Sequence, residues 1–312
     1  MRVFDMHCDT LTVCKKKGWD LDNENCQLRL GDADGFDSYV QLYAVFIPDE
    51  VRGERAQSFF GAHHAYYRRQ LEHLGPRLYD VPDLAALQKA RDRCGMSSIL
   101  AVEGGCVYGG ELGMVEQVYN AGVRSVTLTW NGNNELAGGV MDDGRLTDFG
   151  KEAVHEMERL GIAVDVSHLN DESFYDVLAA TEKPVFASHS NSRAVCSHPR
   201  NLTDDQFCRI AERGGVVGLN FYNQFIADGG EGATFDQMLA HLDHLLQLGG
   251  ENVLALGSDY DGADIEEIID RPRKLKNFYQ ALLDNGFGRE LADKIFYWNA
   301  YGYFERLLAG EL

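Results

Sequence analysis

The chain has 312 residues, of which 45% are apolar and 25% are charged, as is typical of soluble globular proteins. Its net charge of −20 argues against nucleic acid or an anionic membrane as a partner, because both present negative surfaces. The seven dispersed cysteines lack a CxxC pair, and neither a secretion signal nor an apolar run of about 18 residues is found, so we predict a cytoplasmic protein.

Short apolar segments rich in β-branched residues alternate with helical segments along the whole chain. The predicted strands are 3–7, 41–47, 97–102, 125–129, 163–167, 184–188, 215–220 and 253–257. The predicted helices are 55–74, 82–92, 111–121, 148–160, 171–180, 204–213, 235–248, 274–285 and 291–308. This alternation predicts an α/β fold of the (β/α)₈ TIM-barrel type. Because no linker or repeat divides the sequence, we expect one domain over residues 1–312.

Polar side chains able to bind metal follow five of the predicted strands. His7 and Asp9 end the first strand, where alternation along a strand would turn both side chains the same way. Glu103 follows the third strand, and the other candidates, His168, His189 and Asp259, follow the fifth, sixth and eighth. The carboxyl ends of parallel strands meet at one mouth of a barrel, so these distant residues should converge there.

Imidazole and carboxylate groups are ligands for zinc and related divalent ions. A carboxylate has two oxygens and can therefore bridge two ions, which makes Glu103 the natural bridging ligand. Gly104 and Gly105 follow it and allow close backbone approach. The sequence thus predicts a metal site built from five strand ends.

Several of these residues stand in longer motifs. In chain order the motifs are His7-x-Asp9, Glu103-Gly104-Gly105, Asp165-Val166-Ser167-His168, Ser188-His189-Ser190, Arg200-Asn201, Asn220-Phe221-Tyr222 and Gly257-Ser258-Asp259-Tyr260-Asp261-Gly262. Together, and in this order, they resemble the renal (membrane) dipeptidase family of the amidohydrolase superfamily. The match runs from the first predicted strand to the last.

The resemblance implies two Zn²⁺ ions, although manganese or cobalt could also be the working metal. One ion would be held by His7, Asp9 and Glu103, and the second by Glu103, His168 and His189. Arg200 matches the arginine that contacts the substrate in that family, and Asp259 matches the aspartate beside the bridging water. A homodimer is compatible with the resemblance.

The chain departs from the animal enzymes at the end of the fourth strand. They carry a substrate-binding histidine after a Leu-Thr pair, whereas this chain reads Leu128-Thr129-Trp130-Asn131. Trp130 or Asn131 could take over that contact, and Tyr222 could add a hydroxyl contact. With no lipid-anchor or secretion signal found, the chain resembles the soluble microbial branch.

The predicted activity is hydrolysis of the peptide bond of dipeptides, either L-Xaa-L-Xaa or L-Xaa-D-Xaa. Two metal ions about 3.5–4 Å apart can share a water and lower its pKa toward ~7, which supplies hydroxide at neutral pH. Asp259 would accept the water's proton and pass it to the leaving amine. Arg200 would hold the substrate's C-terminal carboxylate through a charge-assisted contact.

Two other functions remain open at this stage. A metal-dependent amidohydrolase acting on N-acyl amino acids or another small amide could use the same metal site, and Trp130 keeps this alternative open. A binding protein that lost its chemistry is disfavoured, because every metal position and Asp259 are filled by competent residues.

Several other polar residues have ordinary structural interpretations. Cys8 should face away from its neighbours as a packing residue, and Asp261 should orient the loop ending at Gly262. The histidines of the 55–74 helix, His63, His64 and His73, are predicted to be solvated.

Overall fold

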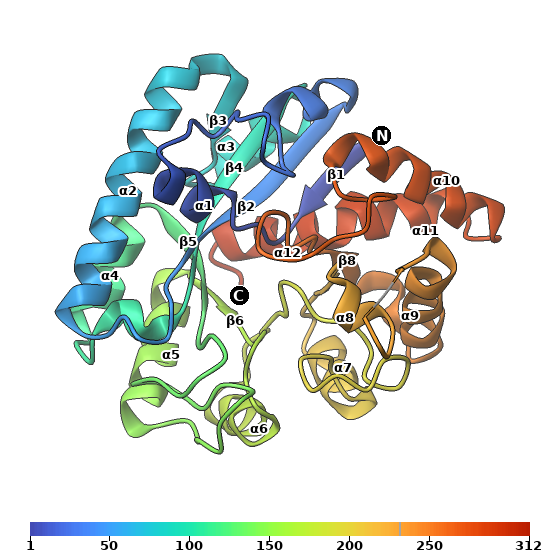
Figure 1. Cartoon of the computed structure of the whole chain (residues 1–312). Coiled ribbons are helices and arrows are strands. Elements are labelled where there is room, and N and C mark those ends of the chain that lie inside the picture. The colour runs from blue at the N-terminus through green and yellow to red at the C-terminus, as the bar shows by residue number, and fades with distance from the viewer. Residues whose placement is uncertain (231) are drawn as a thin grey trace.

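The computed structural model describes residues 1–230 and 232–312 and contains a strongly curled, all-parallel sheet (Figure 1). Its main path runs in the order β6-β5-β4-β2-β1-β8-β7, and β3 pairs with β4 beside this path. The strands are β1 (Arg2–Asp5), β2 (Ser38–Phe46), β3 (Leu78–Asp80), β4 (Met96–Glu103), β5 (Val123–Thr127), β6 (Ala163–Asp165), β7 (Val217–Leu219) and β8 (Leu254–Leu256). The first strand thus pairs with both the second and the last.

The segment predicted as the sixth strand, 184–188, does not form a regular strand. It makes two single-residue parallel bridges instead, Asp165 with Phe186 on one side and Ala187 with Val217 on the other. These bridges join the two ends of the main path, β6 and β7. The prediction of a regular strand was therefore wrong, although its position between β6 and β7 agrees with the structure.

Helices connect most of the strands, and several begin and end where the sequence predicts. Side-chain N-caps explain two of these boundaries: Thr147 caps α5 and Asn170 caps α6. The helices are α1 (Thr10–Lys17), α2 (Glu54–Leu74), α3 (Leu84–Arg91), α4 (Gly113–Asn120), α5 (Asp148–Leu160), α6 (Asp171–Ala180), α7 (Asp204–Glu212), α8 (Asn223–Ile226), α9 (Phe235–Gln247), α10 (Leu275–Asp284), α11 (Arg289–Asp293) and α12 (Asn299–Leu308). Within the described residues, none of these helices combines the length and the apolar character needed to cross a membrane.

The C-terminal segment packs against the strands rather than only covering them. The predicted 291–308 helix is observed as α11, a π-helical turn over Lys294–Trp298, and α12. Phe304 of α12 stacks on Phe4 of β1 with ring centroids 5.3 Å apart, in a cluster with residues of β2, β4, β6 and β8. Phe4 precedes His7 by three residues, so this apolar cluster supports the strands just before the site residues begin.

His241 of α9 is a buried polar residue that ties two loops to the helix. Its Nδ1 accepts from the Ser192 backbone N–H, and its Nε2 donates to the Ile226 carbonyl. Burial lowers its pKa from 6.5 to about 4. Only a neutral imidazole can accept at Nδ1 and donate at Nε2, so protonation would break the first contact.

We expect His241 to make the protein less stable in acid. His241 takes up a proton near pH 6.5 in the unfolded chain and only near pH 4 in the folded chain. Its contribution to the free energy of unfolding is therefore complete above pH 6.5 and is lost as the pH falls toward 4. The full loss is about 3 kcal/mol of unfolding free energy. Urea unfolding at pH 7 and at pH 4.5 should therefore show a smaller pH effect in His241→Gln than in the wild type. An equal pH effect in the two proteins would contradict this assignment.

Candidate functional site

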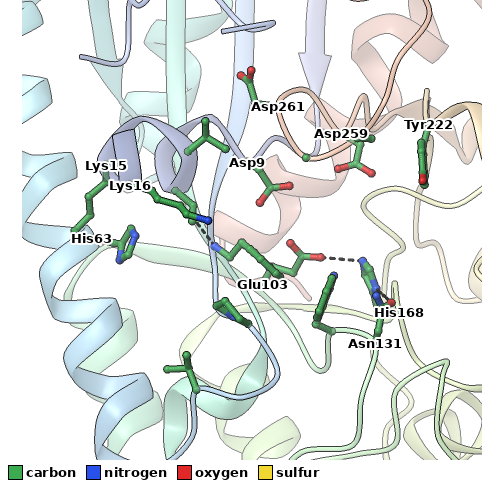
Figure 2. A pocket seen from close by; sticks show the side chains of 18 of the residues that line it. Asp9, Lys15, Lys16, His63, Glu103, Asn131, His168, Tyr222, Asp259 and Asp261 are labelled. Carbon is green, nitrogen blue, oxygen red and sulfur yellow. Dashed lines mark hydrogen bonds and ion pairs between the residues drawn. The ribbon is translucent and has the colours of Figure 1, made fainter. Parts of the chain in front are cut away.

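A cavity of about 790 Å³ opens at the carboxyl ends of the strands (Figure 2). Most of the residues predicted to act in the site line it: Asp9, Glu103, Trp130, Asn131, His168, Arg200, Tyr222 and Asp259. The remaining two, His7 and His189, are buried and stack on each other with ring centroids 3.9 Å apart. All ten predicted site residues therefore lie in one region.

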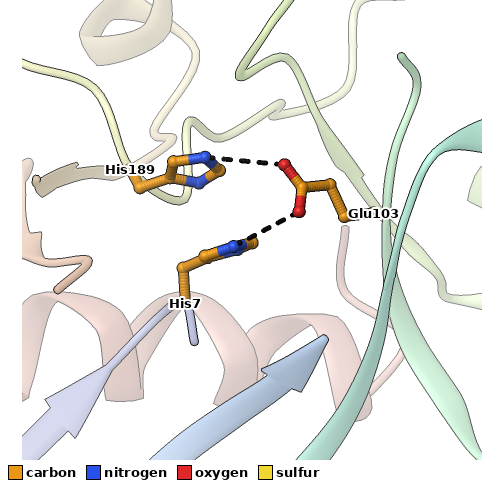
Figure 3. Close-up of side chains that lie close together, drawn as sticks. All are labelled: His7, Glu103 and His189. Atoms are coloured by element: carbon orange, nitrogen blue, oxygen red, sulfur yellow. Dashed lines mark ion pairs between the residues drawn. The ribbon is translucent and has the colours of Figure 1, made fainter. Parts of the chain in front are cut away.

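Glu103, the last residue of β4, lies at the centre of this region. Its Oε2 is 3.5 Å from His7 Nε2, which is also 3.5 Å from Asp9 Oδ2. Its Oε1 is 2.8 Å from His168 Nε2 and 3.9 Å from His189 Nε2 (Figure 3 shows the contacts with His7 and His189). The two carboxylate oxygens thus face two different groups of potential ligands.

Hydrogen bonds fix the ring of His189. Asp165 can only accept, so the Ser188 hydroxyl donates to Asp165 Oδ2, 2.5 Å away. The Ser188 oxygen is then the acceptor for His189 Nδ1–H at 2.6 Å. Because burial lowers the pKa of His189 well below its ordinary value, the ring is neutral and carries one proton. That proton is on Nδ1, which leaves a lone pair on Nε2.

The same reasoning applies to His168. Its Nδ1 lies 3.0 Å from Asn131 Oδ1, an acceptor, so Nδ1 carries the proton. Burial and then the Arg200 cation lower the pKa of His168 well below its ordinary value, so this ring is also neutral. The Asn131 side chain was predicted to contact substrate; in the structure it lines the cavity and its oxygen accepts from His168.

These donor atoms fit a cation. The Nε2 atoms of His168 and His189 face each other at 3.0 Å, each with a lone pair, and both face Glu103 Oε1. His7 Nε2 and Asp9 Oδ1 are buried, and neither has a hydrogen-bond partner among the residues that the structure describes. Lone pairs aimed at one another are unfavourable unless a positive charge lies among them. This is the arrangement that histidine and carboxylate ligands take around a divalent metal.

The charges of the site also favour a bound cation. Burial, together with the nearby Asp9 carboxylate, raises the pKa of Glu103 to about 7 and also raises the pKa of Asp259. Burial lowers the pKa of His7, but the Glu103 and Asp9 carboxylates outweigh this effect and raise it well above its ordinary value. A cluster of buried carboxylates thus attracts protons when no other cation is present, and a bound metal would replace those protons.

Three site residues have a backbone conformation that is rare outside glycine. The φ angles of His168, Asp259 and Asp261 are 71°, 66° and 66°. Such conformations persist where surrounding contacts hold them, and they concentrate at functional sites. Asp261 is held by the Thr10 hydroxyl and by the backbone N–H groups of Gln27 and Leu28. These contacts agree with the structural interpretation of Asp261.

Gly262 follows these residues and is packed directly against the acidic side chains. A Cβ at this position would lie 1.9 Å from Asp9 Oδ2 and 2.6 Å from Asp259 Oδ1. Any larger residue would therefore displace one or both carboxylates.

We expect Gly262→Ala to lower kcat/KM by about 100-fold, because a displacement of about 1 Å in reacting groups costs that much. Gly302→Ala is a matched control, since a Cβ there meets nothing within 4 Å. Both variants should be assayed for turnover and for thermal stability. Full activity in Gly262→Ala would mean that Asp9 and Asp259 tolerate displacement.

Three further predicted residues lie around the candidate metal ligands. Arg200 is buried, and its Nη2 lies 3.4 Å from the His189 carbonyl. Its Nε has no hydrogen-bond partner within residues 1–230 and 232–312. Trp130 packs edge-on against Phe46, with ring centroids 4.9 Å apart. Tyr222 is the N-cap residue just before α8 and lines the opposite part of the cavity from His63 (Figure 2).

The sequence interpretation missed several residues of the site. His63 was predicted to be solvated, but it is buried at 3% exposure and lines the cavity, because α2 turns this side of the helix inward. Ser188 had been noted only as a neighbour of His189, and nothing local indicates its contact with Asp165. Lys15 and Lys16 also line the cavity, on a helix that was not predicted.

Comparisons with known proteins identify the family. The family described as membrane dipeptidase (peptidase family M19) matches residues 1–305. The chain belongs to the membrane dipeptidase family. The resemblance seen in the sequence motifs is therefore confirmed, and the protein is a hydrolase of a metallopeptidase family.

Relatives and solved structures agree with this assignment. An uncharacterized protein of Klebsiella pneumoniae is 32% identical over 246 residues, which is 75% of this chain and 91% of that protein. An uncharacterized dipeptidase of Schizosaccharomyces pombe is 36% identical over 205 residues, 64% of this chain, and the match covers half of that protein's length.

Two solved structures match nearly the whole chain. A metallopeptidase from Rhodobacter sphaeroides, liganded with a phosphinate mimic of the dipeptide L-Ala-D-Ala, superposes with a TM-score of 0.92 at 28% identity, covering 98% of this chain and 99% of that one. A second metallopeptidase, dipeptidase AC, gives a TM-score of 0.90 at 29% identity and covers 98% of both chains.

Proposed function

We propose that this member of the membrane dipeptidase family is a binuclear zinc dipeptidase that hydrolyses L-Xaa-L-Xaa and L-Xaa-D-Xaa dipeptides. The observation that carries the proposal is the position of Glu103, whose two oxygens face two separate groups of nitrogen and oxygen ligands. The phosphinate mimic of L-Ala-D-Ala in the Rhodobacter sphaeroides structure supports a dipeptide substrate of mixed stereochemistry.

The ligand sets follow from the distances around Glu103. Oε2 would serve one metal together with His7 and Asp9, and Oε1 would serve the other together with His168 and His189. Ser188 and Asn131 would keep the two ring nitrogens free for the metal by holding the protons on Nδ1. When bound, the two zinc ions supply Lewis acidity and a hydroxide nucleophile at neutral pH.

Asp259 is proposed to move the proton during hydrolysis. Its Oδ2 accepts from Asn220 Nδ2 at 3.0 Å, which leaves Oδ1 directed at the metal-binding groups, 3.9 Å from His7 Nε2. A buried carboxylate with a raised pKa is suited to take a proton from water and return it to the leaving amine.

Arg200 is proposed to hold the C-terminal carboxylate of the dipeptide. It is buried and lines the cavity, and its Nε, which has no partner in the described part of the chain, gives it spare donor capacity. Burial lowers its pKa only to about 10, so the guanidinium remains charged at neutral pH. A charge-assisted contact of this kind would also fix where the scissile bond lies.

We also propose that residues 1–312 form one catalytic domain of the TIM-barrel type. The single-residue bridges of Phe186 and Ala187 would complete the ring between β6 and β7. The pairing of β1 with β8 supports a single domain, because the two ends of the chain contribute to the same sheet.

The test is a matched substrate panel for the zinc-loaded protein: L-Xaa-L-Xaa and L-Xaa-D-Xaa dipeptides, their N-acetyl forms and one tripeptide. Turnover confined to the free dipeptides is the expected result. Turnover of the N-acetyl forms alone would replace the proposal with an amidohydrolase acting on N-acyl amino acids. Metal analysis should give two zinc ions per chain, and a single ion would contradict the binuclear site.

A further inference from the structure

Two lysines of α1 line the cavity at a distance from its histidine ligands. Lys15 is half-buried and Lys16 is exposed, and neither ammonium group forms an ion pair within the described part of the chain. In Figure 2, Lys15, Lys16 and His63 gather on one side of Glu103, while Asn131 and His168 lie on the other. We call this part of the cavity, lined by Lys15, Lys16 and His63, the lysine side.

The lysine side has the features of a binding surface for a side chain. The ring of His63 stacks on Phe59 at 4.0 Å and its Nδ1 bonds the Phe59 carbonyl at 2.8 Å, so this wall is fixed. Pro48 and Val51 also line the cavity and add apolar surface to it, and its lining carboxylates include Glu50 and Asp9. The ammonium groups of Lys15 and Lys16 bring positive charge to this side of the cavity, in a chain whose net charge is −20.

The position of the lysines in their helix does not by itself explain this arrangement. Basic residues stabilise the last turn of a helix through its dipole, and Lys15, Lys16 and Lys17 all lie in the last turn of α1. Lys15 and Lys16 line the cavity, however, and Lys17 does not line it. The helix dipole explains why three basic residues occur in the last turn, but it does not explain why two of them line the cavity.

We propose that Lys15 and Lys16 make the enzyme prefer dipeptides whose first residue carries an acidic side chain. This inference rests on the proposed dipeptidase function and on Arg200 as the site of the C-terminal carboxylate. Arg200 contacts the His189 carbonyl, and His168 lies across Glu103 from the lysines in Figure 2. A dipeptide whose second residue is held at Arg200 would therefore extend its first residue across Glu103 toward the lysine side. The cavity of about 790 Å³ has room for a side chain as long as glutamate.

The test compares kcat/KM for Glu-Ala and its isostere Gln-Ala, with Ala-Glu and Ala-Gln as the reversed pair. Both members of each pair keep the C-terminal carboxylate, so their ratio reports on the side chain alone. We expect Glu-Ala to exceed Gln-Ala by about fivefold or more, and the ratio to shrink in about 0.5 M salt. The reversed pair should give a ratio near one.

Variants connect the preference to the lysines. In the double variant Lys15→Met/Lys16→Met the Glu-Ala to Gln-Ala ratio should fall to about one, and in Lys15→Glu/Lys16→Glu it should invert. Lys17→Met is the matched control and should keep the wild-type ratio. Because each ratio is measured on one protein preparation, partial loss of folded protein does not affect it.

The outcomes separate this inference from the proposed function. Turnover of all dipeptides with equal rates for Glu-Ala and Gln-Ala would overturn the role of the lysines and leave the dipeptidase intact. A preference confined to Ala-Glu would overturn the placement of the first residue. A Glu-Ala to Gln-Ala ratio that stays at the wild-type value in the Lys15→Met/Lys16→Met variant would also overturn the proposal, whatever the change in absolute rates. A protein that hydrolyses none of the dipeptides would instead contradict the proposed function.

Discussion

Replacing Asp259 with asparagine should lower kcat by roughly 100- to 10,000-fold, the range expected when a positioned acid–base group is lost. The amide matches the carboxylate in shape, and its oxygen can still accept from Asn220 Nδ2, so the loop from Asp259 to Gly262 should keep its conformation. An amide cannot accept a proton at neutral pH. The variant should therefore retain the two zinc ions that we propose and lose the proton transfer.

Two measurements on the same preparation check this prediction: metal content per chain and kcat for a dipeptide. Asp243→Asn, the same change at an exposed position of α9, controls for the loss of one negative charge. Wild-type turnover in Asp259→Asn would show that Asp259 does not carry the proton. Loss of a zinc ion would instead identify Asp259 as a ligand, an outcome made plausible by its position near His7 and Asp9.

The parts of the site that follow from strand order could be predicted from the sequence. In a parallel sheet all carboxyl ends lie at one edge, so residues such as Glu103 and His168 converge without any local signal between them. The prediction did not depend on accurate strand ends: β1 ends at Asp5, two residues earlier than predicted, and His7 and Asp9 still come within 3.5 Å.

Other elements could not be predicted, for identifiable reasons. The α1 helix begins Thr10-Leu11-Thr12-Val13, and three β-branched residues in its first four weaken any helical signal. Charged residues bound the apolar part of strand β3, since Arg77 and Asp80 leave only Leu78 and Tyr79 as an apolar pair, which is too short to indicate a strand. The segment 184–188 is apolar like a strand, but in the structure it contributes only single-residue bridges to β6 and β7.

The supporting contacts of the site lay beyond sequence patterns altogether. The chain from Asp165 through Ser188 to His189 joins residues 24 positions apart, and Asn131 reaches His168 across 37 positions. Serine and asparagine are common in loops, so their identity alone does not distinguish a metal-supporting contact from a turn. Only the arrangement of the loops around the cavity brings these side chains together.

Replacing Glu103 with glutamine should have the largest effect on metal binding of any single change in the site. In the wild type each carboxylate oxygen faces a different ligand group, 3.5 Å from His7 Nε2 and 2.8 Å from His168 Nε2. Glutamine has one oxygen and one NH₂ group, so it can serve only one of the two groups and presents a donor to the other. We expect metal affinity to fall by more than the roughly 10- to 100-fold that loss of an outer-shell partner costs.

Zinc titration against a chelator measures this loss, and kcat should fall with zinc occupancy. Glu111→Gln, at an exposed position of the loop after β4, makes the same chemical change outside the site and should bind zinc like the wild type. Two zinc ions held by Glu103→Gln at wild-type affinity would rule out a bridging role for Glu103. Loss of one ion with the other retained would mean that the glutamine oxygen still serves one ligand group. That group would be either His7 with Asp9 or His168 with His189.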